Sequence, residues 1–155
     1  MNQFMKAAMD QARIGMNRGD GGPFGAAVVK DGEIIACSHN QVLSTNDPTM
    51  HAEIAAIREA CAKLGRFDLS DCEIYATCMP CPMCLSAIMW AKIPRYHYGA
   101  LDSDAADIGF DDKYIYDFIR GHIKESGALD AVETDADECR VLFAEWSSKD
   151  DKSMY

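Results

Sequence analysis

The residues best suited to chemistry in this sequence are a histidine and two cysteines with metal-ligand spacing. His51 stands two positions before a glutamate, and the run Pro-Cys-Pro-Met-Cys places Cys81 and Cys84 three residues apart. Positions i and i+3 share one face of a helix, so both thiols can approach one ion. One imidazole and two thiolates are a common ligand set for catalytic zinc, with a fourth position left for water. The sequence therefore predicts one zinc ion per subunit, held by His51, Cys81 and Cys84.

The nearby glutamate, Glu53, is expected to carry protons and not to bind the metal. A hydrolytic zinc site needs an open coordination position, and zinc lowers the pKa of bound water to about 7 from about 15.7. A carboxyl group beside that position can take a proton from the attacking water and deliver it to the substrate and to the leaving group. This arrangement is typical of zinc-dependent hydrolysis.

Two other kinds of metal site stay open as alternatives. Cys78 extends the motif to Cys-x-x-Cys-x-x-Cys, so it could supply a fourth ligand and close the site as a structural zinc site. In that case Glu53 would have no chemical role. An iron–sulfur site is less favoured, because a fourth cysteine in a Cys-Pro context is missing. The remaining cysteines are interpreted as small buried apolar residues, namely Cys37, Cys61, Cys72 and Cys139. The other histidines, His39, His97 and His122, are interpreted as structural or solvent-facing, and Met83 and Trp90 as core residues.

The hydrophobic pattern predicts the elements that position these residues. Apolar residues at helical spacing predict helices over 2–18 and 51–64, and a helix over 81–92 that is apolar almost all round and therefore buried. Two apolar runs joined by Asp31-Gly32 predict a β-hairpin. The remaining predicted elements are strands at 72–78 and 95–100, a loop over 39–50, short helices at 102–107 and 112–120, a weak strand near 129–133 and a helix at 136–148. Strands that alternate with helices imply a parallel sheet between helix layers.

Composition narrows the class of protein. The chain has 155 residues, which fits a single domain over 1–155, and its formal net charge of −10 speaks against a nucleic-acid partner. No apolar run reaches the roughly 18 residues that span a bilayer, so no membrane association is expected. Seven cysteines without a secretory signal indicate a reducing cytoplasm.

The metal motif, with its glutamate, resembles that of the cytidine-deaminase-like superfamily of zinc-dependent deaminases. The similarity covers nearly the whole chain and is closer to the bacterial guanine deaminase branch. It is carried by Gly-Gly-Pro-Phe-Gly-Ala (21–26), Asn-Asp-Pro-Thr-Met-His-Ala-Glu-Ile (46–54), Cys-Pro-Met-Cys (81–84), Ala-Asp-Ile-Gly-Phe-Asp-Asp (106–112) and the terminal Tyr155. The resemblance implies a three-layer α/β/α sandwich with a five-stranded mixed sheet, assembled as a homodimer in which the C-terminal segment is exchanged between subunits.

The resemblance also implies a purine substrate and the residues that bind it. Asn40 would hydrogen-bond the purine, Phe24 would wall or stack on the base, Asp112 would bind polar ring edges, and Tyr155 would cover the pocket of the neighbouring subunit. The implied reaction converts guanine and water to xanthine and ammonia. One departure is Met79, where many relatives carry glutamate. A deaminase of another base (tRNA adenosine, cytosine, a triazine or a pterin) and a non-catalytic module with a structural zinc remain as alternatives.

Overall fold

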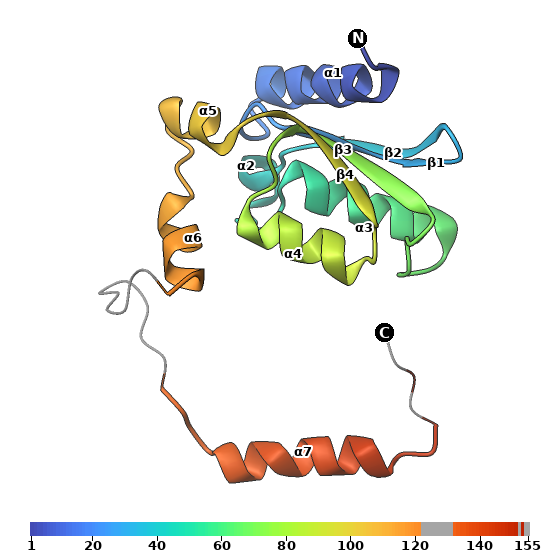
Figure 1. Ribbon diagram of the computed structural model, residues 1–155, viewed down its shortest axis with the longest axis vertical. Coiled ribbons are helices and arrows are strands. Elements are labelled where there is room, and N and C mark those ends of the chain that lie inside the picture. Colours follow the sequence, from blue (N-terminus) through green and yellow to red (C-terminus); the bar gives the residue numbers. More distant parts are fainter. Residues whose placement is uncertain (122–131, 152, 154–155) are drawn as a thin grey trace. The chain divides into compact units, whose positions relative to one another are not determined.

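The structure is a computed structural model that describes residues 1–121, 132–151 and 153 (Figure 1). The chain divides into two compact units, Met1–Tyr116 and Asp117–Tyr155. The first unit contains the sheet and every described residue of the predicted metal site. The interpretation of 1–155 as a single domain remains a prediction.

The sheet of the first unit is mixed. Its strands are β1 (Gly25–Lys30), β2 (Glu33–His39), β3 (Cys72–Cys78) and β4 (Arg95–Ala100), in the order β2-β1-β3-β4. β1 is antiparallel to β2 and to β3, whereas β3 and β4 are parallel. The prediction of five strands is wrong for the described residues, which form four. Most of the expected fifth strand lies outside them, and residues 132 and 133 are not in a strand.

The predicted hairpin is confirmed. Lys30 pairs with Glu33 across a two-residue turn, and both turn residues, Asp31 and Gly32, have positive φ values of 51° and 80°. A type I′ turn requires this conformation at both positions, and it matches the twist of the flanking strands. Asp-Gly is therefore a local cause of the β1–β2 pairing.

Helices cover both faces of the sheet, which confirms the three-layer sandwich (Figure 1). α1 (Gln3–Arg18) packs on one face, and α3 (Ala52–Leu64) and α4 (Pro82–Trp90) pack on the other. β2, β3 and β4 run in one direction, and α3 and α4 connect them in turn. Because such crossovers are right-handed, both helices must lie on the same face. Both then begin at the same edge of the sheet.

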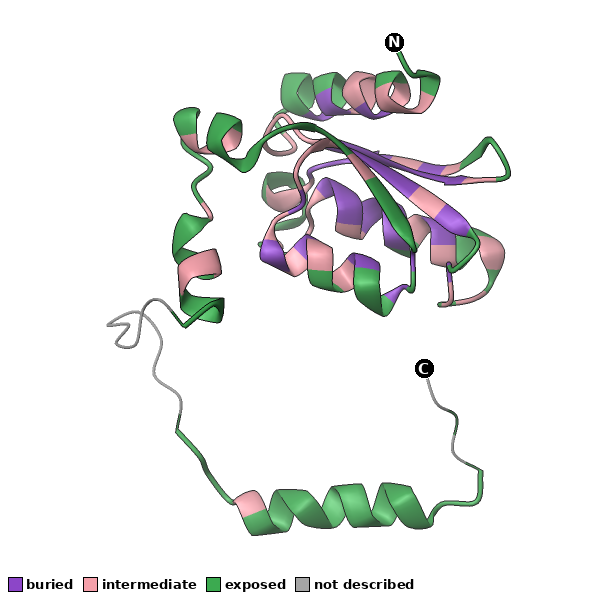
Figure 2. Cartoon of the chain, in the orientation of Figure 1, coloured by how far each residue is buried: buried purple, intermediate pink, exposed green. Residues whose placement is uncertain are grey.

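Small residues form much of the core between α3 and the sheet. Ala52, Ala56 and Ala60 repeat every four residues along α3 and are 0% exposed. Figure 2 shows the buried colour along much of α3. Ile74 of β3 and Ile88 of α4 are buried in the same cluster. The interpretation of α4 as buried all round is wrong at its end: Met89 and Trp90, the latter expected in the core, are 70% and 69% exposed. Among the other cysteines Cys72 is buried as expected, Cys37 and Cys61 are partly buried, and Cys139 is exposed, so that interpretation was wrong for Cys139.

The remaining helices are short or belong to the second unit. They are α2 (Val42–Thr45), α5 (Asp102–Asp107), α6 (Lys113–Ile119) and α7 (Ala136–Ser148). α2 lies within the segment predicted as a loop, since one turn of helix gives too short a pattern to detect. His122 lies outside the described residues. None of the helices among the described residues is both long and apolar enough to cross a bilayer.

Candidate zinc site and substrate cavity

The sheet topology brings the three predicted metal ligands to adjacent helix starts. His51 is the N-cap residue of α3, and Cys81 is the N-cap residue of α4, with Pro82 in the first turn. Proline suits this position because its fixed φ is already helical and its missing N–H needs no partner. Neither N-cap side chain caps its own helix, so both can turn toward a common point. Cys84 follows one turn later on the buried side of α4.

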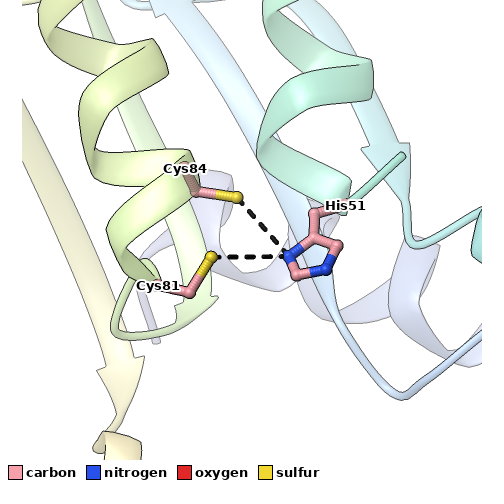
Figure 3. Close-up of side chains that lie close together, drawn as sticks. All are labelled: His51, Cys81 and Cys84. Carbon is pink, nitrogen blue, oxygen red and sulfur yellow. Dashed lines mark hydrogen bonds between the residues drawn. The ribbon is translucent and has the colours of Figure 1, made fainter. Parts of the chain in front are cut away.

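The ligand atoms are spaced as zinc requires. Nδ1 of His51 lies 3.6 Å from Sγ of Cys81 and 3.6 Å from Sγ of Cys84 (Figure 3). Zn–S and Zn–N bonds of about 2.3 and 2.0 Å that meet at a tetrahedral angle hold their ligand atoms about 3.5 Å apart. Among the described residues, this is the one group of His, Cys, Asp or Glu that gathers three ligand atoms within 4.8 Å of one another. The set therefore fits a zinc ion.

The local electrostatics favour the ionised ligands that zinc binds. Hydrogen bonding from the Cys84 thiol, together with His51, lowers the pKa of Cys81 to about 4. The interaction with Cys81 in turn raises the pKa of His51 and, with burial, that of Cys84. The amides at the start of α4 add partial positive charge, which stabilises a thiolate. The site therefore favours a thiolate at Cys81, and a zinc ion would displace the proton of the Cys84 thiol.

Glu53 lines the same cavity as His51 and Cys81. It is in the first turn of α3, two residues after His51, and only 8% of it is exposed. Burial raises the pKa of its carboxyl group. A raised pKa brings a carboxylic acid closer to neutral pH, where accepting and donating a proton are both feasible. Glu53 is outside the group of metal ligands, as the sequence predicts.

A cavity of about 530 Å³ opens beside these groups, a size typical of small-molecule sites. It brings together Phe24, Asn40 and Asp112 with the metal site. Burial raises the pKa of Asp112. Tyr155 lies outside the described residues, so its expected role remains a prediction. The side chains that line the cavity include Phe24, Asn40, His51, Glu53, Cys81 and Asp112.

Asn40 is held rigidly at the cavity wall. It is 5% exposed, and its side-chain Oδ1 accepts a hydrogen bond from the backbone N–H of Val42 at 3.2 Å. The backbone N–H of Asn40 donates to the backbone carbonyl of Phe24 at 3.0 Å. A Cβ at Gly21 would lie 2.0 Å from Oδ1 of Asn40. Only glycine therefore allows the preceding loop to approach this amide so closely.

Sequence reasoning missed several residues of the cavity. Phe110 packs edge-to-face on Phe24, with ring centroids 5.0 Å apart at 86°. It lies in the Gly-Phe-Asp-Asp run, from which only the last aspartate was assigned a role. Cys78 and Met79 also line the cavity. The Cys78 thiol donates to the carbonyl of Leu101 at 3.3 Å and is outside the group of metal ligands, which disfavours a fourth thiolate.

The chain is similar to several characterised deaminases. It is 55% identical over 113 residues to the guanine deaminase of Bacillus subtilis, covering 73% of this chain and 72% of that protein. It is 48% identical over 99 residues to a tRNA-specific adenosine deaminase of Agrobacterium fabrum, covering 64% of each chain. The crystal structure of the Bacillus subtilis guanine deaminase matches with a TM-score of 0.93 at 45% identity, over 100% of this chain and 99% of that one.

A structure of the guanine deaminase from Nitrosomonas europaea matches with a TM-score of 0.66 at 34% identity, over 70% of this chain and 63% of that one. The family model for the cytidine and deoxycytidylate deaminase zinc-binding region matches residues 1–100. That segment contains Glu53 and the three candidate zinc ligands, His51, Cys81 and Cys84. With this match and the ligand geometry, the chain belongs to the cytidine and deoxycytidylate deaminase family of zinc-dependent aminohydrolases.

Proposed function

We propose that this protein hydrolyses guanine to xanthine and ammonia. The observation that carries the proposal is one cavity in which His51 and Cys81 of the candidate zinc site and Glu53 meet Asn40, Asp112 and an aromatic wall. Similarity to the Bacillus subtilis guanine deaminase supports a purine base. A related structure, 35% identical over 70% of this chain and 61% of that one, with a TM-score of 0.67, is described as a complex with 2,6-diaminopurine.

The cavity offers complementary partners for a planar purine. The ring of Phe24 provides an aromatic wall, and its edge-to-face contact with Phe110 fixes that wall. The amide of Asn40 can both donate and accept hydrogen bonds, and a carboxylate at Asp112 accepts from ring N–H groups. A purine bound in this way would direct the carbon that bears its 2-amino group toward His51 and Glu53.

The chain's own residues then hold and move the proton. Zinc, when bound, would lower the pKa of water and make it available as a nucleophile at neutral pH. Glu53 would accept a proton from that water and donate it to N3 of the ring while the C2–oxygen bond forms. A second proton would pass through Glu53 to the amino group as the C2–nitrogen bond breaks. Water and guanine thereby give xanthine and ammonia, with no net change at Glu53.

Charge favours a free base over a nucleotide or RNA. The described cavity lining includes Glu53, Asp102, Asp111 and Asp112, and it contains no lysine or arginine. Nucleotide and RNA phosphates are commonly bound by lysine and arginine side chains, which this lining does not offer. The net charge of −10 points the same way. Deamination of adenosine in tRNA, suggested by the names of several relatives, is therefore the second candidate.

The resemblance extends the proposal to assembly and location. We propose a homodimer in the cytoplasm in which the C-terminal segment closes the partner's cavity through Tyr155. Replacement of Tyr155 by alanine should lower activity, whereas phenylalanine, which keeps the ring, should preserve most of it. If the alanine variant is as active as the parent protein, Tyr155 is not part of the site. If the protein is a monomer at the assay concentration, the C-terminal segment is not exchanged between subunits.

The reaction is tested with a substrate panel. Zinc-loaded protein is incubated with guanine, adenine, cytosine, adenosine, a triazine, a pterin and tRNA, and ammonia release is measured. We expect release from guanine with stoichiometric xanthine, and none from a Cys81→Ala variant that lacks a metal ligand. Turnover of another base without turnover of guanine would overturn the substrate assignment. Full activity of Cys81→Ala would overturn the zinc-dependent reaction.

A further inference from the structure

A buried polar side chain that takes no part in the proposed chemistry lies behind the cavity wall. His39, interpreted from the sequence as structural or solvent-facing, is the last residue of β2 and is 8% exposed, so the structural interpretation is the one that holds. Its Nδ1 lies 3.1 Å from Oε1 of Gln11 on α1, and its Nε2 lies 2.9 Å from Oδ2 of Asp20. Both ring nitrogens therefore have partners, on two different segments.

Asp20 connects this imidazole to the loop that lines the cavity. Its N–H donates to the carbonyl of Gly15 at 3.0 Å, which fixes it to the end of α1. Its carbonyl accepts from the N–H groups of Leu43 and Ser44 at 2.9 and 3.1 Å. Asp20 thus joins the end of α1 to the start of α2, where N–H groups need acceptors. The next residue in the chain, Gly21, lines the cavity.

One edge of the imidazole packs closely against α1. A Cβ at Gly15 would lie 2.3 Å from Cδ2 of His39, so the ring rests directly against the backbone of α1. The loop is equally constrained on its other side, where a Cβ at Gly21 would lie 2.0 Å from Oδ1 of Asn40. A displacement of this loop by about one ångström would either press on Asn40 or open a gap beside it. In a close-packed region, either change would shift the Asn40 side chain.

We propose that His39 is a positioning residue of the substrate cavity. Its hydrogen bond to Asp20 holds the loop that carries Gly21 against Asn40 and thereby sets the affinity for the substrate. His39 does not touch the substrate or the metal site. The inference rests on the proposed function only in taking this cavity as the substrate site.

Two substitutions at this position separate its two hydrogen bonds. In His39→Gln the side-chain amide reaches about as far as Nε2, so it can still donate to Asp20. In His39→Asn the shorter amide corresponds to Nδ1, so it can reach Gln11 but not Asp20. Both variants are neutral and polar, which makes each the control for the other. Asp20→Ala removes the same contact from the opposite side.

The kinetic readout is the split between KM and kcat, measured on whichever base the panel identifies. For His39→Asn and Asp20→Ala we expect KM to rise about tenfold, with kcat within about twofold and zinc content unchanged. A tenfold change corresponds to about 1.4 kcal/mol, within the range expected when one buried hydrogen-bond partner is removed. For His39→Gln, KM should stay within about threefold. Equal changes in the asparagine and glutamine variants, or a lower melting temperature with unchanged KM, would overturn the proposal.

A second readout needs no substrate. Hydrogen–deuterium exchange of peptides covering 19–24 and 40–45 should be faster in His39→Asn than in His39→Gln, because only the former lacks the link to Asp20. This difference without any turnover of guanine would refute the substrate assignment while supporting the positioning role. Equal exchange in the two variants would refute the positioning role even in an active guanine deaminase.

Discussion

Replacement of Glu53 by glutamine tests the proton carrier with the least disturbance of the site. The two side chains have nearly the same volume, so the 8% exposed position keeps its packing. The metal ligands are on other residues, so zinc should remain. An amide cannot shuttle a proton, and loss of general acid–base catalysis typically lowers kcat by about 10²–10⁴, or about 2.7–5.4 kcal/mol in barrier height. Burial disfavours a carboxylate here, so the neutral amide should not lower stability.

The assay measures kcat by ammonia release and zinc by elemental analysis on the same samples. Glu59→Gln is the matched control, because Glu59 lies on the same helix, contacts Ser38 and Lys63, and is 40% exposed in its side chain. That control should stay within about twofold of the parent protein, as surface changes usually do. A Glu53→Gln variant that keeps zinc and retains kcat within about fivefold would refute the proton-carrier role.

Three further predictions concern the metal, the core and acid stability. Cys84→Ala should lose zinc by elemental analysis whereas Cys78→Ala keeps it, because only the former removes a ligand. Ile88 is 2% exposed, so shortening its side chain should lower the free energy of unfolding measured in urea. The loss should be about 0.5–1.5 kcal/mol for Ile88→Val and about 2–5 kcal/mol for Ile88→Ala. Hydrogen bonding from Ser70 lowers the pKa of Asp68 from 3.8 to about 2. The ionised Asp68 carboxylate therefore stabilises the folded protein fully above pH 3.8, and this contribution is lost as the pH falls through about 2. Urea midpoints of Asp68→Asn and the parent protein should therefore differ at neutral pH and converge below pH 2.

The metal site could be predicted from the sequence because its spacing is local. Cys81 and Cys84 are one helical turn apart, and the proline between them marks a helix start, so the shared face follows from helix geometry alone. The approach of His51 depends on topology, but alternating helices and strands constrain that topology through the handedness of the crossovers. The hairpin was equally local, since Asp31-Gly32 determines its turn.

Features that depend on tertiary packing could not be predicted in this way. The apolar run at the end of α4 has the composition of a buried helix, yet Met89 and Trp90 are exposed in the described structure. Periodicity cannot distinguish a core face from a face that another surface covers. Phe110 reaches the cavity across a long stretch of sequence to meet Phe24, and no local pattern indicates that contact. The contacts of His39 likewise come from α1 and a loop, both distant in sequence.

The placement of the ligands at N-cap positions links the metal to the stability of the fold. N-cap positions favour serine, threonine, asparagine or aspartate, whose side chains accept hydrogen bonds from the first turn and stabilise it by about 1 kcal/mol. His51 and Cys81 make no such bond, so α3 and α4 begin without side-chain caps. A zinc ion bound to both residues would fix the two helix starts to each other and offset that loss, since metal binding to the folded state is folding free energy. Zinc binding would therefore stabilise the two helix starts that form the site.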